Sequence, residues 1–173
     1  MKKIILKSLL VVSILLFSVL IVNSIVTSPS NDRDWILPQK ILPFAEIKDN
    51  LVTVHNIRNF RYTSMFDYEP NYYDKTFDLR TIKNVWYIVE PFPGVPGSAH
   101  TFLSFEFENN QFLAISVEIR KEQGEIFGAL RGLFNQFEIM YVIADEKDVV
   151  KLRSNFRKDP VYVYPAQGTH EGY

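Results

Sequence analysis

The sequence contains no cysteine among its 173 residues. A disulfide framework is therefore excluded, and no thiolate within these residues can act as a nucleophile or bind a metal. Histidine is also scarce: the three histidines, His55, His100 and His170, show no His-Glu-x-x-His motif or other metal-ligand spacing. The sequence therefore predicts no metal site.

Glycine is sparse as well, with seven residues in the whole chain. No glycine-rich phosphate loop is present, so we expect no cofactor. Ser98, Ser104 and Ser116 lie near His100, but none of them stands in the Gly-x-Ser-x-Gly elbow of a serine hydrolase. A serine nucleophile is therefore not predicted.

Residues 1–26 are typical of a targeting segment. Lys2, Lys3 and Lys7 lie at its start, and residues 9–26 carry no charge and are mostly apolar. Such a run is at the short end of a membrane span and longer than a usual signal-peptide core. We predict an uncleaved single-pass anchor in the inner (cytoplasmic) membrane, with a cleaved signal peptide as the alternative. The positive-inside rule leaves the lysines in the cytoplasm and the rest of the chain in the periplasm or another extracytoplasmic space.

The exported body consists of a polar linker over residues 27–34 and one predicted domain over residues 35–173. Three of the 19 basic residues belong to the anchor, which leaves 16 against 20 acidic residues in the body. This acidic balance lacks the basic stripe that a nucleic-acid partner needs. It does not exclude membrane lipids as a partner. The hydrophobic content of 47% and the aromatic content of 14% are ample for a packed core.

The stretch from Gly97 to Glu125 is predicted to form a β-hairpin with a three-residue turn over residues 108–110. Alternate residues of a strand face opposite sides, so only some registers bring the two apolar faces together. The register with this turn pairs Leu103 with Ile115 and Phe105 with Leu113.

The same register places His100 opposite Glu118. Directly opposed residues have Cβ atoms about 4.5–5.5 Å apart, which is close enough for a carboxylate to hold an imidazole ring. A positioned histidine can act as a general base. The pair is therefore the most chemically suggestive feature of the sequence.

The remaining patterns predict an α+β fold, a mainly antiparallel sheet with two helices that follows the N-terminal membrane helix. Residues 35–44 are expected to be an extended, proline-interrupted arm, and residues 64–75 a loop. The strand over residues 51–63 has no clean apolar face, which favours either a bulge or a strand that partly lines a cleft. The other strands are predicted over residues 84–92, 139–144 and 161–164, and the helices over residues 125–137 and from residue 146, capped by Asp145.

Several segments together resemble one bacterial family, the N-terminal periplasmic domain of Lnb-type lipoprotein N-acyltransferases. Each segment is weak by itself, but their order and spacing are specific, and they cover nearly the whole chain after the anchor. The matching segments are Trp35 to Pro38, Asn56 to Phe60 with Tyr62, Phe77 to Leu79, Ala99 to Phe105, Ser116 to Arg120 with Gly124 and Glu125, Glu138 with Tyr141, Asp145 to Asp148, Leu152 with Arg153, and Val161 to Tyr164.

The resemblance implies a circularly permuted, papain-like fold of the NlpC type. It implies that His100 is the catalytic base and that Glu118 is a candidate for orienting it. The family's nucleophilic cysteine would follow well beyond Tyr164, in an Asn-Cys-Thr-like motif that these residues do not contain. Membrane lipids or acylated lipoproteins are the expected partners.

Four further motif residues are candidates for binding a lipid head group or for bracing the cleft: Arg58, Tyr62, Arg120 and Glu138. The alternative for the three charged residues is structural ion pairing, because buried charges usually pair with one another. The alternative for Tyr62 is packing in the domain.

Two functional hypotheses follow from the missing cysteine. In the first, the chain is a C-terminally truncated piece of an acyltransferase-like protein and is inactive alone. In the second, it is a membrane-tethered binding module, or a remnant of the family, that lacks the chemistry.

Overall fold

The structure is a computed structural model that describes residues 2–26, 30–125 and 137–166. Its first element, α1 (Lys2–Val26), forms where the sequence predicts a helix. The apolar side chains of α1 from Leu9 to Val22 are exposed. Within the described residues, no helix is both long and apolar enough to span a membrane. The helix itself is confirmed, and its role as an anchor stays a prediction.

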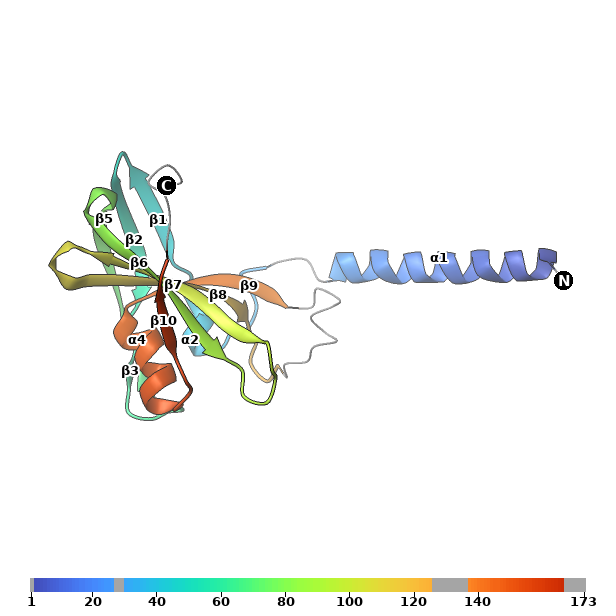
Figure 1. Ribbon diagram of the computed structural model, residues 1–173. Coiled ribbons are helices and arrows are strands. Elements are labelled where there is room, and N and C mark those ends of the chain that lie inside the picture. The colour runs from blue at the N-terminus through green and yellow to red at the C-terminus, as the bar shows by residue number, and fades with distance from the viewer. Residues whose placement is uncertain (1, 27–29, 126–136, 167–173) are drawn as a thin grey trace. The chain divides into compact units, whose positions relative to one another are not determined.

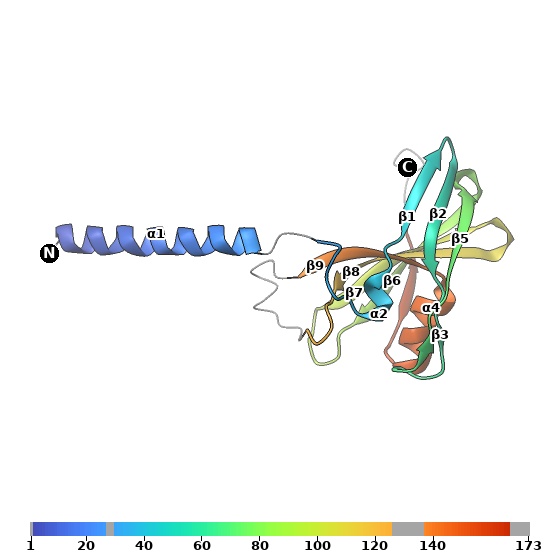
Figure 2. The same cartoon turned by 180° about the vertical axis from the view of Figure 1, so that it is seen from behind.

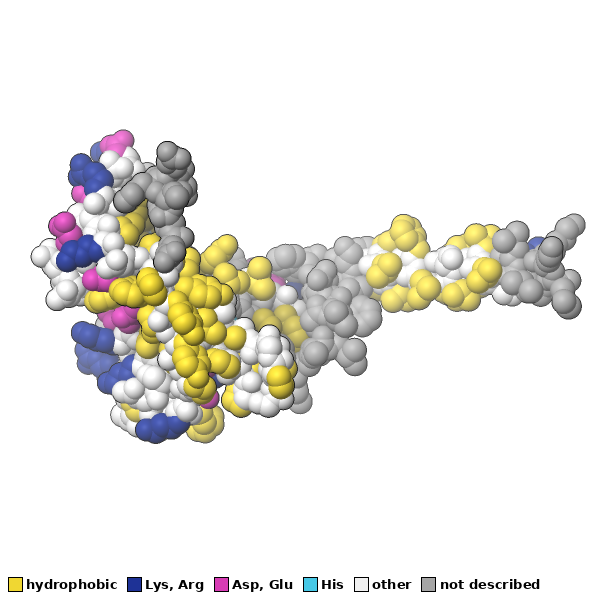
Figure 3. Space-filling view, viewed as in Figure 1, with side chains coloured by type: hydrophobic (Ala, Val, Ile, Leu, Met, Phe, Trp, Pro, Cys, Tyr) yellow, Lys and Arg dark blue, Asp and Glu magenta, His cyan; other side chains and the backbone are white. Residues whose placement is uncertain are grey.

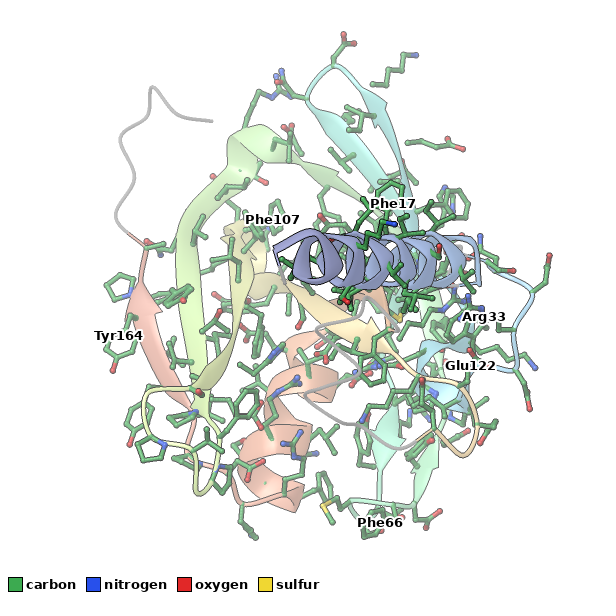
Figure 4. All side chains as sticks on the ribbon, turned by 90° about the vertical axis from the view of Figure 1, so that its right-hand side faces the viewer. Phe17, Arg33, Phe66, Phe107, Glu122 and Tyr164 are labelled. Atoms are coloured by element: carbon green, nitrogen blue, oxygen red, sulfur yellow. The ribbon has the colours of Figure 1, made fainter. Side chains whose placement is uncertain are left out.

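By its internal contacts the chain divides into two compact units. The first consists of residues 1–36 and 120–138, and the second of residues 37–119 and 139–173. In the first unit, Trp35 forms an isolated antiparallel bridge to Glu122. Arg33 and Glu122 of the same unit point toward each other, with Arg33 Nη1 3.0 Å from Glu122 Oε1 (Figure 4).

The second unit is built on an eight-stranded sheet, in the order β1-β2-β9-β8-β7-β6-β10, with β5 paired to β2 (Figure 1). Its strands are β1 (Phe44–Lys48), β2 (Leu51–Arg58), β5 (Tyr72–Asp78), β6 (Ile82–Pro91), β7 (Ala99–Phe107), β8 (Gln111–Arg120), β9 (Glu138–Ala144) and β10 (Tyr162–Pro165). Figure 2 shows β1, β2 and β5 side by side. Neighbouring strands whose residue pairing is defined run antiparallel, except that β2 and β9 pair in parallel at Arg58 and Ala144. The predicted α+β class is confirmed.

The β7–β8 hairpin has the predicted register, with Leu103 opposite Ile115 and Phe105 opposite Leu113. A short 3₁₀ turn, Glu108–Asn110, joins the strands. Asn109 and Asn110 both have positive φ there, 62° and 55°. Asparagine tolerates this left-handed conformation, which explains why the turn falls at these residues.

Two hydrophobic clusters hold the sheet. One face of the sheet packs Ile88, Phe102, Ala114, Met140 and Val142 against Val149 of α4 (Glu146–Lys151). The second cluster joins Val54, Ile57 and Phe77 of β2 and β5 to Phe107 and Leu113 at the far end of the hairpin. Side chains that alternate along β7 therefore enter different clusters, as the period of two requires.

The sequence prediction was wrong in several places. Residues 37–40 form a short helix, α2 (Leu37–Lys40), with Pro38 in its first turn, where a missing N–H costs little. Residues 72–75 belong to β5 rather than to a loop, and β1 was not predicted. The predicted bulge is confirmed, because the β2–β5 register shifts between Val54 and Ile57.

The two predicted helices have different outcomes. Asp145 caps α4 as expected, its side chain accepting a hydrogen bond from Lys147 N, and the chain continues into a π-helical turn, Leu152–Phe156. The helix expected over residues 125–137 falls almost entirely outside the described residues.

Candidate functional site

His100 and Glu118 face each other on neighbouring strands, as the hairpin register predicts. His100 Nε2 lies 3.3 Å from Glu118 Oε1, and both side chains are largely buried, with 17% and 25% of their surface exposed. Ser116 lies between them: its Oγ is 2.8 Å from His100 Nε2 and 2.9 Å from Glu118 Oε1. Ser116 is fully buried and shares the strand face of Glu118 two residues further on.

These three residues fix the tautomer of the neutral imidazole. An ionised carboxylate only accepts hydrogen bonds, so the single hydroxyl proton of Ser116 is donated to Glu118. Ser116 Oγ must then accept a hydrogen bond from His100 Nε2, so the ring proton of His100 is on Nε2. Nδ1 is left with its lone pair, and it has no hydrogen-bond partner in the described part of the chain. An imidazole in this state can take up a proton at Nδ1.

Glu118 is held in its charged form by Arg153. Arg153 Nη2 donates to Glu118 Oε1 at 2.9 Å, and Arg153 Nε donates to Glu90 Oε2 at 2.6 Å. Burial alone would raise the pKa of Glu118, but the hydrogen bond with His100 and the charge of Arg153 lower it to about 2. The carboxylate therefore stays ionised at neutral pH and can stabilise a positive charge on His100.

The network continues away from the histidine. Glu90, which is opposite His100 in the β6–β7 register, is almost fully buried. Its other oxygen, Oε1, lies 2.7 Å from Arg157 Nη2, and Arg157 Nε lies 2.7 Å from Asp159 Oδ2. Alternating charges of this kind limit the cost of burying each carboxylate.

Arg58 and Tyr62 meet at Asp148 rather than at His100. Arg58 donates two hydrogen bonds of 3.0 Å to the two carboxylate oxygens of Asp148, whose side chain is fully buried. Phe60 N and Tyr62 Oη donate to the same carboxylate at 2.9 and 3.2 Å. This geometry favours the ion-pairing alternative for Arg58.

The pKa values around Asp148 follow from this burial. Burial alone would lower the pKa of Arg58, but the charge and hydrogen bonds of Asp148 raise it above the usual value. Burial raises the pKa of Tyr62, and the neighbouring carboxylate of Asp148 acts in the same direction. Both groups therefore keep their protons in the folded protein.

Arg120 and Glu138 belong to the first compact unit. The Arg120 guanidinium stacks on the Trp35 ring at 4.1 Å, and its Nη1 donates to Asn31 Oδ1 at 2.9 Å. Glu138 Oε1 accepts from Ser30 N at 2.8 Å and lies 3.3 Å from an Arg33 nitrogen. The structure brings these two candidates together with the polar segment before Trp35, a role that the sequence did not suggest.

Two cavities are defined by the described residues, and no candidate residue borders the larger one. That cavity, of about 740 Å³, opens beside Arg80, Lys83, Val85 and Phe105, at the opposite end of β6 and β7 from His100. Arg58 borders a space of about 10 Å³, about the size of one water molecule. Within the described residues, no group of three acidic or histidine side chains is placed to hold a metal ion.

Sequence reasoning missed Ser116, Glu90 and Arg153 as parts of the site. Ser116 could have been predicted from the sequence, because it is on the same strand face as Glu118 and two residues closer to the turn. Glu90 required the β6–β7 register, which the Pro/Gly loop between those strands does not reveal. Arg153 was named only within a segment that resembles the family, without a role in the site.

The comparisons with known proteins agree with the resemblance. The family of the Lnb N-terminal periplasmic domain matches residues 68–172, which include His100, Ser116, Glu118 and Arg153. No curated protein and no solved structure matches the chain. The match covers more than half of the sequence, so the chain belongs to the family of the Lnb N-terminal periplasmic domain.

Proposed function

We propose that this chain is a membrane-anchored periplasmic domain that supplies the base side of a cysteine acyl-transfer site. The observation that carries the proposal is the His100–Ser116–Glu118 arrangement, which leaves Nδ1 of a partly buried imidazole free to accept a proton. The thiol must come from outside these 173 residues, because they contain no cysteine. The papain-like character of the site belongs to this proposal.

His100 takes up one proton and gives it back in each half of the reaction. Nδ1 takes the proton of the thiol, and the thiolate attacks an acyl carbonyl, so that a C–S bond forms and the bond to the leaving oxygen breaks. The imidazolium returns the proton to that oxygen. In the second half, Nδ1 accepts a proton from an amine as the amine attacks the thioester and forms an amide. The imidazolium returns that proton to the sulfur as the C–S bond breaks. Glu118, acting through Ser116, stabilises the imidazolium in both halves.

The anchor is the second part of the proposal. It is supported by the three lysines before residue 9, by the apolar run that follows and by the helical conformation of α1. A domain held beside the bilayer would meet acylated lipoproteins and membrane lipids as substrates. Arg58, Tyr62, Arg120 and Glu138 stay candidates for head-group binding.

A soluble acyl thioester tests the base without the missing cysteine. The full chain in detergent is mixed with a short-chain acyl thioester and a primary amine, and amide formation is measured for the native chain and for His100→Gln. We expect the variant to lose roughly ten-fold in rate, less than the 10²–10⁴ that a general base supplies to a positioned substrate. The control Glu108→Gln, in the exposed hairpin turn, should react like the native chain. Equal rates for the native chain and His100→Gln would contradict the proposal.

A non-catalytic binding module is the second candidate function, and the absence of any thiol in these residues favours it. Such a module would bind a diacylated lipopeptide with the native site intact and would transfer no acyl group. Binding of the lipopeptide together with equal thioester aminolysis in native and His100→Gln chains would support the module over the base.

A further inference from the structure

On the side of the central sheet away from α4, part of the surface is apolar and has no cover in the described part of the chain. Six of its outward-pointing side chains come from five neighbouring strands: Ile139 and Tyr141 of β9, Val117 of β8, Leu103 of β7, Tyr87 of β6 and Tyr164 of β10. We call these six residues the outer face. Their exposed fractions run from 36% for Leu103 to 73% for Ile139.

The outer face is continuous across the strands. Tyr164 is directly opposite Tyr87, Tyr87 is opposite Leu103, and Leu103 is opposite Ile115. Figure 3 shows hydrophobic side chains gathered over the region of β10, and Figure 4 labels Tyr164 at this edge strand. Adjacent side chains of this kind form a patch rather than isolated apolar residues, and such patches mark interaction sites.

Alternation along the strands explains why these residues are exposed. The chain neighbours of the outer face, Ile88, Phe102 and Met140, point to the opposite side and are buried in the cluster under α4. The apolar pattern is therefore present on both sides of the sheet. The side that carries the outer face is packed only at its far end, where Phe107 and Leu113 join the second cluster. A strand that packs on one side normally alternates with polar residues, so the apolar outer face calls for a partner.

The chemistry of the outer face fits a lipid bilayer. None of its six members is charged, and three of them are tyrosines, whose apolar ring and polar hydroxyl suit the boundary between head groups and acyl chains. Protein interfaces are also enriched in tyrosine, but they carry arginine as well, and none of the six residues is an arginine. The body is net acidic, so attraction by anionic lipids does not drive the contact.

Chain length also favours the bilayer as the occupant, and this step rests on the anchor proposed above. The eight residues of the linker, 27–34, span at most about 29 Å when fully extended. An anchored domain therefore never leaves the neighbourhood of the membrane surface. We propose that the outer face docks on the lipid bilayer and holds the sheet against the membrane.

The absence of native cysteine allows a clean labelling experiment. The full chains Leu103→Cys and Tyr141→Cys, each labelled with an environment-sensitive fluorophore, are reconstituted into phosphatidylcholine vesicles that contain phosphatidylcholine spin-labelled near the head group. Glu69→Cys, at an exposed polar position of the second unit, is the control. We expect at least three-fold stronger quenching at positions 103 and 141 than at position 69, with no change when salt is added.

Three other results would overturn docking. If the chain floats with the vesicles but quenching is equal at positions 103 and 69, docking is contradicted and the anchor proposal still holds. Failure of the chain to float with the vesicles would overturn the anchor and docking together. The label could instead be shielded from aqueous iodide but not quenched by the lipid. If this shielding increases with the protein-to-lipid ratio, a second copy of the chain covers the outer face.

Discussion

A serine between a histidine and a carboxylate changes what each residue does. Glu118 is close enough to His100 to act on it electrostatically, at 3.3 Å, but the shortest contact of the ring is with Ser116. The serine hydroxyl donates a hydrogen bond to the carboxylate and accepts one from the ring. The orientation of His100 is therefore set by two groups on β8, and neither acts alone.

Part of this site follows from the sequence. The polar turn and the alternation of apolar residues are enough to pair His100 with Glu118, because a hairpin register depends on local information. Arg153 and Glu90 are joined to the pair only by contacts between distant segments. Their buried ion pairs depend on how α4 and its π-helical extension pack on the sheet, which no local pattern contains.

The charge on Glu118 predicts how stability changes in acid. Its pKa is about 2 in the folded chain, below its value of 4.5 when exposed, so its stabilising effect is complete above about pH 4.5 and is lost as the pH falls toward 2. Between pH 7 and pH 3 the native chain should lose up to about 2 kcal/mol of unfolding free energy that Glu118→Gln does not lose. Urea unfolding at both pH values measures the difference. The exposed control Glu108→Gln should follow the native chain, and a Glu118→Gln chain that does the same would refute the assignment.

At the scale of elements, Asp148 fixes α4 to the sheet. One carboxylate near the start of α4 accepts hydrogen bonds from Arg58 on β2, from Phe60 N and from Tyr62 on β3 (Arg61–Tyr62). These hydrogen bonds join the stretch over residues 58–62 to the start of α4. Arg58 and Asp148 are 90 residues apart in sequence, so their pairing is invisible without the fold.

Removing the carboxylate should therefore destabilise the protein strongly. Asp148→Ala leaves the Arg58 guanidinium buried without its partner, and breaking such a pair costs about 3–5 kcal/mol. Arg61→Ala is the control, because Arg61 and Glu69 form an exposed pair at 3.8 Å that contributes little. Chemical denaturation at neutral pH compares the two variants, and Asp148→Asn serves as a milder change if the alanine variant does not fold. A loss below about 1 kcal/mol in both Asp148 variants would mean that the pair is not structural.

Two segments have a different conformation from the predicted one, and the reason can be identified in each case. Proline suggested an extended arm at residues 35–44, yet Pro38 fits the first turn of α2, where no N–H is needed. The tyrosine-rich stretch before residue 75 was expected to be a loop. It forms part of β5 because β2 offers it a pairing edge, and tertiary pairing outweighs local composition.

At the scale of the whole molecule, the candidate site belongs to a domain with a defined location and a candidate membrane surface. The family assignment places the domain in the periplasm, the helix α1 supplies a candidate anchor, and the outer face supplies a surface on which the sheet can rest. The absence of cysteine confines the contribution of these residues to the base side of the chemistry. The central claim is that Nδ1 of His100 has no proton and no hydrogen-bond partner among the described residues.

Nitrogen-15 NMR of the histidine ring tests this claim most directly. Ring nitrogen shifts distinguish a protonated from an unprotonated nitrogen, and His100 is assigned by comparison with His100→Gln. In the neutral ring we predict a proton on Nε2 and a lone pair on Nδ1, with the preference reduced in Ser116→Ala. A neutral ring that carries its proton on Nδ1 would contradict the account, because Nδ1 could then not accept the proton of a thiol.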